Sequence, residues 1–327
     1  MRTLSPSPRA FVDPATGAPA FGSYEGKLPR IDLGGGLVDR ALRRKRWVWI
    51  ALASEEMWLS AAIVRMGYAT SAFAFVFDLR ERKMLVDETI VAPPRMAKVA
   101  DDPHEPGTLA RFGFGARRLA IERRGEVWEL RGRVGSLEID ACVDESEAPP
   151  PIAAIARLGP GLASATEKRA LARARGSVTA AGRRFSLEGA LGGYDYTNGA
   201  MPRHTRWRWA FAMGRAKDGE VVAFNVVEGF VGEAECAAFV GGRVLPIHEP
   251  RFDFDARNPS AAWRLRGEGV DLVFDVGAVH AQHTNLFFVR SRFLQPVGTF
   301  RGTIRAGDRD LELDGVPGVV EDQDVLW

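Results

Sequence analysis

The sequence has 327 residues, 46% of them hydrophobic and 26% charged, and its 44 basic and 42 acidic side chains nearly balance. The apolar content is typical of a globular protein and excludes bulk disorder, and the near-neutral charge argues against nucleic acid held mainly through phosphates. Two cysteines, Cys142 and Cys236, are too few for a disulfide framework and are not spaced as metal-binding pairs, while the length predicts about two domains.

Residues 1–36 are rich in proline and glycine and predict an N-terminal arm or loop. They lack the apolar core of a secretory signal, and no later stretch approaches the roughly 18 apolar residues of a membrane-spanning helix. We therefore expect a cytoplasmic location, where thiols stay reduced.

Residues 37–151 predict a first β-domain, because short runs of aromatic and β-branched residues alternate with polar or glycine-containing turns. In residues 137–143 the odd positions are apolar and most even positions are polar, as in a half-buried antiparallel strand. The runs are RWVWIAL, AAIVRMGY, SAFAFVFDLRER, KMLVDETIV, RFGFGARRLAIER, EVWELRGRV and SLEIDACVD.

The triple proline at 149–151 predicts a boundary, because such a run is stiff and lacks hydrogen-bond donors. Residues 161–175, GLASATEKRALARAR, favour a helix by propensity. From Ser177 the strand pattern resumes and continues to the end, so residues 152–327 predict a second β-domain.

The two halves share an internal repeat. Arg46-Trp47-Val48-Trp49 returns as Arg206-Trp207-Arg208-Trp209, a shift of 160 positions. Two further matches follow in the same order at similar shifts: Gly67-Tyr68 with Gly229-Phe230, and Phe75-Val76 with Phe239-Val240. The repeat predicts an all-β fold of two tandem antiparallel barrels or strongly curved sheets with little helix.

The segment 192–214 is the densest in polar and aromatic residues. If 205–213 is a strand, Trp207 and Trp209 share one face and Arg206 and Arg208 the other. Either the tryptophans are packed core, or this strand lines a ligand cavity. The preceding loop would place Asp195, Tyr196 and Asn198 at the cavity rim, although the first and last could equally form turns.

Two acidic features are further candidates. Glu228 alternates with Phe224 and Val226, so an apolar face would raise its pKa and make it an acid, unless an arginine pairs with it. The run 321–324 is either part of the site or a solvated tail.

Metals and cofactors are not predicted. His280 and His283 have zinc-like spacing only on a helix, and they lie between strand-like runs with no obvious third ligand. Nucleotide-binding and hydrolase motifs are absent from the sequence, so no cofactor is expected.

These motifs resemble the bacterial domain of unknown function 2804 family. The likeness extends from about Gly22 to the end and rests on YDYTNGAMPRHTRWRWA, FNVVEGF, VDLVFD, FLQPVGTFRGTI and GVVEDQDVLW. The resemblance implies two lipocalin-like barrels, related to carotenoid hydratases and tocopherol cyclases, and a strand at 166–168 in place of the helix. The matching positions are Asp195, Thr197, Gly199, Thr205, Arg206, Trp207, Arg208, Trp209, Asn225, Gly229, Glu235, Glu321, Asp322 and Trp327. The sequence departs from the family pattern at Cys236 and Gln323, which weakens the case for a histidine-assisted acid at the C-terminus.

Two functions follow as expectations. The first is binding of a hydrophobic or amphiphilic molecule, such as a lipid or isoprenoid, inside or between the barrels. The alternative is a cofactor-free enzyme in which Asp195 or Glu228 protonates an alkene and tryptophan faces stabilise the cation. A protein-binding scaffold is disfavoured, no nucleic-acid partner is expected, and peripheral membrane contact is compatible with either function. The predicted ligand-binding residues are Tyr196, Asn198, Arg206, Trp207, Arg208, Trp209, Asn225, Glu321 and Asp322.

Overall fold

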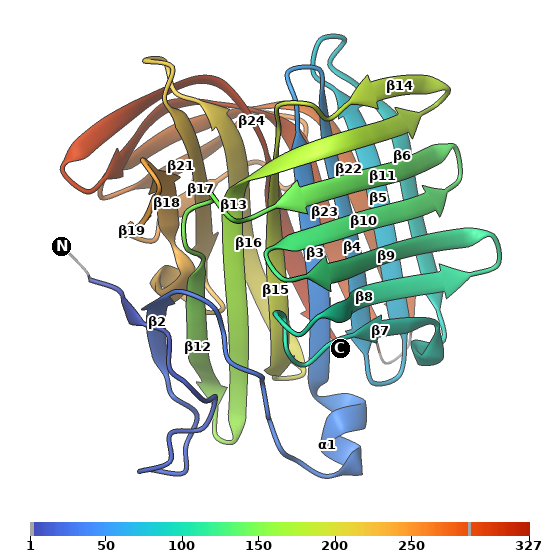
Figure 1. Ribbon diagram of the computed structural model, residues 1–327, viewed down its shortest axis with the longest axis vertical. Coiled ribbons are helices and arrows are strands. Elements are labelled where there is room, and N and C mark those ends of the chain that lie inside the picture. Colours follow the sequence, from blue (N-terminus) through green and yellow to red (C-terminus); the bar gives the residue numbers. More distant parts are fainter. Residues whose placement is uncertain (1–2, 287–288) are drawn as a thin grey trace.

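A computed structural model describes residues 3–286 and 289–327 of the chain and confirms the all-β prediction (Figure 1). Two curled sheets, antiparallel except for one short parallel pair in the N-terminal arm, follow one another along the chain and pack together, as expected for two tandem barrels. In the described residues, helical structure is limited to α1 (Leu37–Leu42) and the single-turn segments η1 (Pro94–Met96) and η2 (Gly232–Glu235). None of these helices is long and apolar enough to cross a membrane.

The first sheet holds the strands up to Ala200. Its spatial order is β6 (Lys83–Ala92), β5 (Thr70–Asp78), β4 (Met57–Met66), β3 (Arg44–Ala53), β15 (Ala190–Ala200), β13 (Leu162–Ala180), β11 (Leu137–Asp144), β10 (Val127–Val134), β9 (Arg117–Arg124), β8 (Gly107–Phe114) and β7 (Ala97–Val99). At its margins, β14 (Arg183–Ser186) and β12 (Ile152–Gly159) pair with β13, and the arm adds β2 (Gly22–Glu25) and β1 (Ser5–Pro6).

The second sheet repeats this topology. Its order is β19 (Arg243–Pro246), β18 (Ala237–Val240), β17 (Val221–Glu228), β16 (His204–Arg215), β24 (Arg309–Leu326), β23 (Val289–Ala306), β22 (Val270–Leu286), β21 (Trp263–Gly267) and β20 (Arg251–Asp253). Each sheet contains a meander of four consecutive strands, β3 to β6 in the first and β16 to β19 in the second. The first strand of each meander also pairs with the last strand of the same sheet, β3 with β15 and β16 with β24. The repeated Arg-Trp-x-Trp motif lies on the corresponding strands β3 and β16.

The helix predicted at 161–175 is wrong. All but the first of these residues belong to the long strand β13, which pairs with β11, β12 and β15. Propensity for helix is worth only fractions of a kcal/mol per residue, and the ladders on both sides of β13 override it.

The change of sheet does not coincide with the triple proline. Strands β12 to β15 follow the prolines, yet they belong to the first sheet, and the crossing to β16 occurs at residues 201–203. We therefore propose that the two halves divide there.

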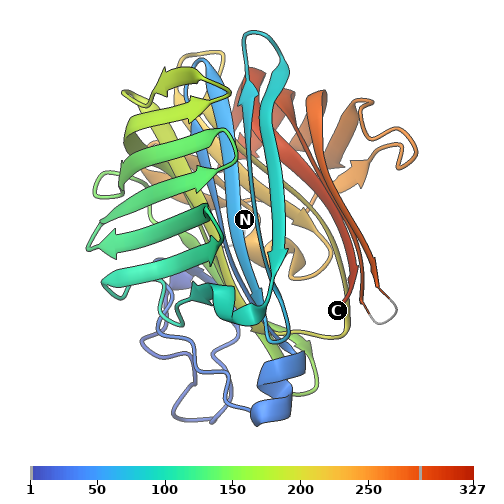
Figure 2. The same ribbon diagram turned by 90° about the vertical axis from the view of Figure 1, so that its right-hand side faces the viewer.

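The two sheets pack against each other, and Figure 2 shows the strands of the second half (yellow to red) beside those of the first half (blue to green). Their ring contacts join β3 to β16, and β5 to β22 and β23. On β3, alternation sends Val48, Ile50 and Leu52 into the core of the first sheet. The other face of β3, with Trp49 and Ala51, packs against residues of the second sheet. The interface is therefore lined by side chains from both halves of the repeat.

Candidate functional site

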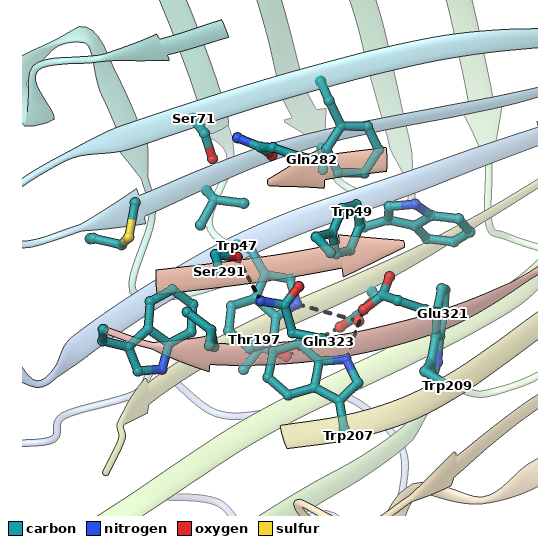
Figure 3. Close-up of a pocket in the computed structure, with 18 of the residues that line it drawn as sticks. Trp47, Trp49, Ser71, Thr197, Trp207, Trp209, Gln282, Ser291, Glu321 and Gln323 are labelled. Carbon is teal, nitrogen blue, oxygen red and sulfur yellow. Dashed lines mark hydrogen bonds between the residues drawn. The ribbon is translucent and has the colours of Figure 1, made fainter. Parts of the chain in front are cut away.

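A cavity of about 390 Å³ lies between the two sheets, within the range of about 300–1,000 Å³ typical of small-molecule sites (Figure 3). Its wall is mainly aromatic and aliphatic, with a few polar groups. The lining residues are Trp47, Trp49, Ala62, Val64, Met66, Tyr68, Ala69, Ser71, Phe73, Val91, Lys168, Asp195, Thr197, Trp207, Trp209, Val227, Phe230, Glu235, Gln282, Ser291, Phe293, Glu321, Gln323, Val325 and Trp327.

Four tryptophans from the sequence repeat form one wall of the cavity. Trp47 stacks on its equivalent Trp207 with ring centroids 5.8 Å apart, and Trp49 meets its equivalent Trp209 edge-on at 4.8 Å. Each half therefore presents the same face to the other, as in a contact around a two-fold axis. The predicted shared face of Trp207 and Trp209 is the cavity face.

Each half also contributes a carboxyl group at an equivalent position. Asp195 pairs in register with Trp49 on β3, as Glu321 does with Trp209 on β16. The indole of Trp47 donates to Asp195 Oδ2 at 3.3 Å, and that of Trp207 donates to Glu321 Oε1 at 2.7 Å. Two of the three acids that line the cavity are thus held by an indole N–H, and the third is Glu235.

The two carboxyl groups differ in their remaining partners. Glu321 is buried and accepts a second hydrogen bond from the Gln295 amide at 2.7 Å, with no cation at ion-pair distance among the described residues. Burial raises the pKa of Glu321 to about 7, against the opposing effect of the Gln295 and Trp207 hydrogen bonds. Near neutral pH this carboxyl group can therefore both give and take a proton.

Asp195 instead belongs to a buried ion cluster. The ammonium group of Lys168 lies 2.6 Å from Asp195 Oδ2 and 3.4 Å from Glu235 Oε2. Burial opposes the charged form of Lys168, but these two carboxylates outweigh it and raise its pKa. Burial also raises the pKa of Glu235.

Of the predicted site residues, Asp195, Trp207, Trp209 and Glu321 line the cavity. Asn225 lies behind them, where it accepts the Trp209 indole N–H at 2.7 Å. The run that begins with Glu321 is part of β24 and not a solvated tail.

The remaining predicted residues lie away from the cavity lining. Residues 190–200 form a strand and not a loop, so Tyr196 and Asn198 project from the face opposite Asp195. The Tyr196 hydroxyl donates to the Ala100 carbonyl at 2.9 Å, and Asn198 contacts Asp101.

On β16, Arg206 is exposed, and Arg208 pairs with Glu228 at 2.8 Å. Glu228 is therefore in an ion pair with an arginine, the alternative to its predicted role as an acid. Asp322 is buried on the side of β24 opposite Glu321, 2.7 Å from Arg292 and 3.6 Å from Arg208. Neither acid reaches the cavity lining.

Lys168 and Gln295 also contact the site acids, and neither was among the residues predicted from the sequence. Lys168 lies in the segment 161–175, which was expected to be a helix and not part of a site. Gln295 occurs in the FLQPVGTF motif that carries the family resemblance, which is the one signal that pointed to it.

A metal site is not formed by the residues that the structure describes, since no three His, Cys, Asp or Glu side chains are suitably grouped. The His280 ring is buried against Phe73, with Nδ1 2.5 Å from Asp87 Oδ1, while His283 is exposed.

Comparisons with known proteins agree with this fold. The structure is similar to kievitone hydratase from Nectria haematococca, with a TM-score of 0.51, 14% identity, and coverage of 94% of this chain and 97% of that one. It is also similar to CghA with Sch210972, with a TM-score of 0.53, 12% identity, and coverage of 99% and 97%. At such identities the likeness shows the fold alone, and no curated protein matches the sequence. The family described as domain of unknown function (DUF2804) matches residues 12–327, and the chain therefore belongs to that family.

Proposed function

We propose that this protein binds an apolar, unsaturated small molecule in the cavity between its sheets and that Glu321 transfers a proton to it. The observation that carries the proposal is a buried, protonatable carboxyl group inside a mainly apolar cavity with a wall of tryptophans. A carrier needs only the apolar wall, whereas an acid catalyst needs such a group as well. The cavity therefore favours the enzyme of hydratase, cyclase or isomerase type over the simple carrier.

Binding would rest on burial of apolar surface against the tryptophan wall, at about 25 cal/mol for each Å² removed from water. The geometry also fits the charge that develops in such a reaction. The Trp47 and Trp207 rings flank the two carboxyl groups, and an aromatic face stabilises a nearby cation.

The proposed reaction begins with transfer of a proton from Glu321 to a double bond of the substrate. The O–H bond of protonated Glu321 breaks, and the π electrons of the substrate form a new C–H bond with that proton. The adjacent cationic carbon then takes one of three courses. Addition of water and loss of a proton from its oxygen gives hydration, attack by an internal double bond and loss of a proton from the resulting cation gives cyclisation, and direct loss of a neighbouring proton gives isomerisation. In each course the Glu321 carboxylate accepts the proton that is lost and is protonated again. Asp195 is less suited to the first step because the Lys168 ammonium group already neutralises its carboxylate. The name of one fold neighbour, kievitone hydratase, is in keeping with the first outcome.

Binding is tested with a neutral apolar fluorophore, N-phenyl-1-naphthylamine. The wild type is expected to bind one molecule with enhanced fluorescence, and Ala62→Phe to weaken binding at least about tenfold, because the added ring occupies the cavity wall. Ala281→Phe, on an exposed site of β22, is the control and should bind as the wild type does. Equal binding by both variants would place the fluorophore elsewhere.

Catalysis is tested in D₂O with a panel of isoprenoid alkenes, using mass spectrometry to follow deuterium in the products. The wild type is expected to form a C–D bond, and Glu321→Gln to lose at least about hundredfold in rate while it still binds the fluorophore. Unchanged deuterium incorporation in the variant would exclude Glu321 as the acid.

A further inference from the structure

The short helix α1 carries apolar side chains that no described residue covers. Leu37, Val38 and Leu42 are 85%, 70% and 60% exposed, and α1 buries none of its residues. The described residues expose six large apolar side chains in all, of which three are in α1 and a fourth, Val91, lines the cavity at 58% exposure. Exposed apolar surface is thus concentrated at one place.

That place is beside the cavity. The backbone of α1 contacts the turn after β4 so closely that a Cβ atom on Gly67 would lie 2.0 Å from the Ala41 carbonyl oxygen. The next two residues of the turn, Tyr68 and Ala69, line the cavity. Behind α1, the buried Lys45 donates to the Leu42 carbonyl oxygen at 2.6 Å, and its ammonium group lies over the ring of the cavity residue Tyr68. Figures 1 and 2 both show α1 at the lower end of the molecule, beyond the ends of β3 and β4.

The helix and the residue that follows it, Arg43, together carry two arginines and one acid. Arg40 and Arg43 are exposed, and the one acid of α1, Asp39, lies 3.5 Å from Arg43. Arg40 has no ion-pair partner within the described part of the chain. Apolar side chains next to arginine are the combination by which amphipathic helices bind the interface of an anionic membrane.

We propose that α1 docks this protein on an anionic phospholipid bilayer, with Leu37, Val38 and Leu42 inserted at the acyl-chain boundary beside the cavity. The ligand would then pass between the bilayer and the cavity without crossing water. The inference rests on the proposed function only in taking the ligand to be apolar, and it does not depend on the chemistry of Glu321.

The test is co-sedimentation with sucrose-loaded vesicles of phosphatidylcholine, with and without 30 mol% phosphatidylglycerol. The wild type is expected to bind the anionic vesicles, more weakly in 0.5 M NaCl. The L37S/V38S/L42S variant is expected to bind at least about tenfold more weakly. Because α1 buries no side chain, the melting temperature of this variant should match that of the wild type. Phe114→Ser removes an equally apolar, exposed side chain from the end of β8 and should leave binding unchanged.

Three outcomes overturn the docking proposal: no vesicle binding by the wild type, equal binding by the triple variant, or equal loss in Phe114→Ser. A dimer that the triple variant converts to a monomer, seen by light scattering after gel filtration, would instead make α1 a contact between two copies. N-phenyl-1-naphthylamine binding without vesicles should persist in the triple variant, so failure of docking is distinguishable from failure of the proposed function.

Discussion

Replacing Glu321 by glutamine is expected to remove about 3 kcal/mol of pH-dependent stability between pH 4.5 and pH 8.5. The pKa of this buried carboxyl group is raised from an ordinary value of 4.5 to about 7, and each pKa unit corresponds to about 1.4 kcal/mol. The effect is measured by urea unfolding of the wild type and Glu321→Gln at several pH values.

The sign follows from which state holds the proton more tightly. Because the pKa of Glu321 is higher in the folded than in the unfolded protein, folding is favoured by protonation. This contribution is fully present below pH 4.5 and is lost as the pH rises through about 7. The free energy of unfolding of the wild type, relative to that of the variant, should therefore fall across this window.

The difference between the free energies of unfolding of the two proteins at each pH gives the contribution of Glu321, because every other titrating group is common to both. Glu312→Gln, an exposed substitution of the same kind on β24, is the control and should show no such difference. If the free energies of unfolding of the wild type and Glu321→Gln change in parallel from pH 4.5 to 8.5, the pKa of the Glu321 carboxyl group is not raised. Glu321 would then be excluded as the proposed acid.

Much of the fold could be predicted from the sequence because it depends on local pattern and on the repeat. Period-two alternation marks the strands, and the shift of 160 positions predicts two similar halves. The repeated motif also supplies the tryptophans of the cavity wall. A contact around a two-fold axis brings equivalent residues together, as it does for Trp47 and Trp207.

The strand β13 shows why a helix was wrongly predicted at 161–175 and why Lys168 was not predicted as a site residue. Both faces of its first half, residues 163–170, are covered, yet this part buries neighbouring charged residues, Lys168 toward the cavity and Arg169 against Glu145. A strand covered on both faces normally has a continuous apolar sequence, so a segment rich in Ala, Arg, Lys and Glu resembled a helix. The partners that satisfy these charges are distant in sequence and come together only in the folded sheet.

The acids were partly misplaced for a related reason. Reading residues 192–199 as a loop left Asp195, Tyr196 and Asn198 free to share one rim, whereas a strand places Asp195 and Tyr196 on opposite faces. Glu228 has an apolar neighbourhood along its own strand, but its Arg208 partner is on the adjacent strand and depends on register.

Substitution of Lys168 by methionine is expected to destabilise the protein by about 3–5 kcal/mol at pH 8. The variant would leave Asp195 and Glu235 buried without the ammonium group that lies 2.6 and 3.4 Å from them, and an uncompensated buried charge carries a cost of this order. At pH 5 the loss should be smaller, because burial raises the pKa of Glu235, which takes up a proton more readily at the lower pH. Urea unfolding at both pH values measures the difference.

Two further variants separate loss of the ion pair from loss of a long side chain. Lys45→Met removes another buried lysine, whose pKa burial lowers to about 8 and which has no carboxylate partner among the described residues. It should cost about 1.5–3 kcal/mol, the value of one hydrogen bond from a charged donor. The combined K168M/D195N/E235Q variant removes the stranded charges and should recover a substantial part of the lost stability. Equal losses in Lys168→Met and Lys45→Met, with no recovery in the combined variant, would show that Lys168 stabilises the fold by packing alone and that Asp195 does not depend on it for its charge.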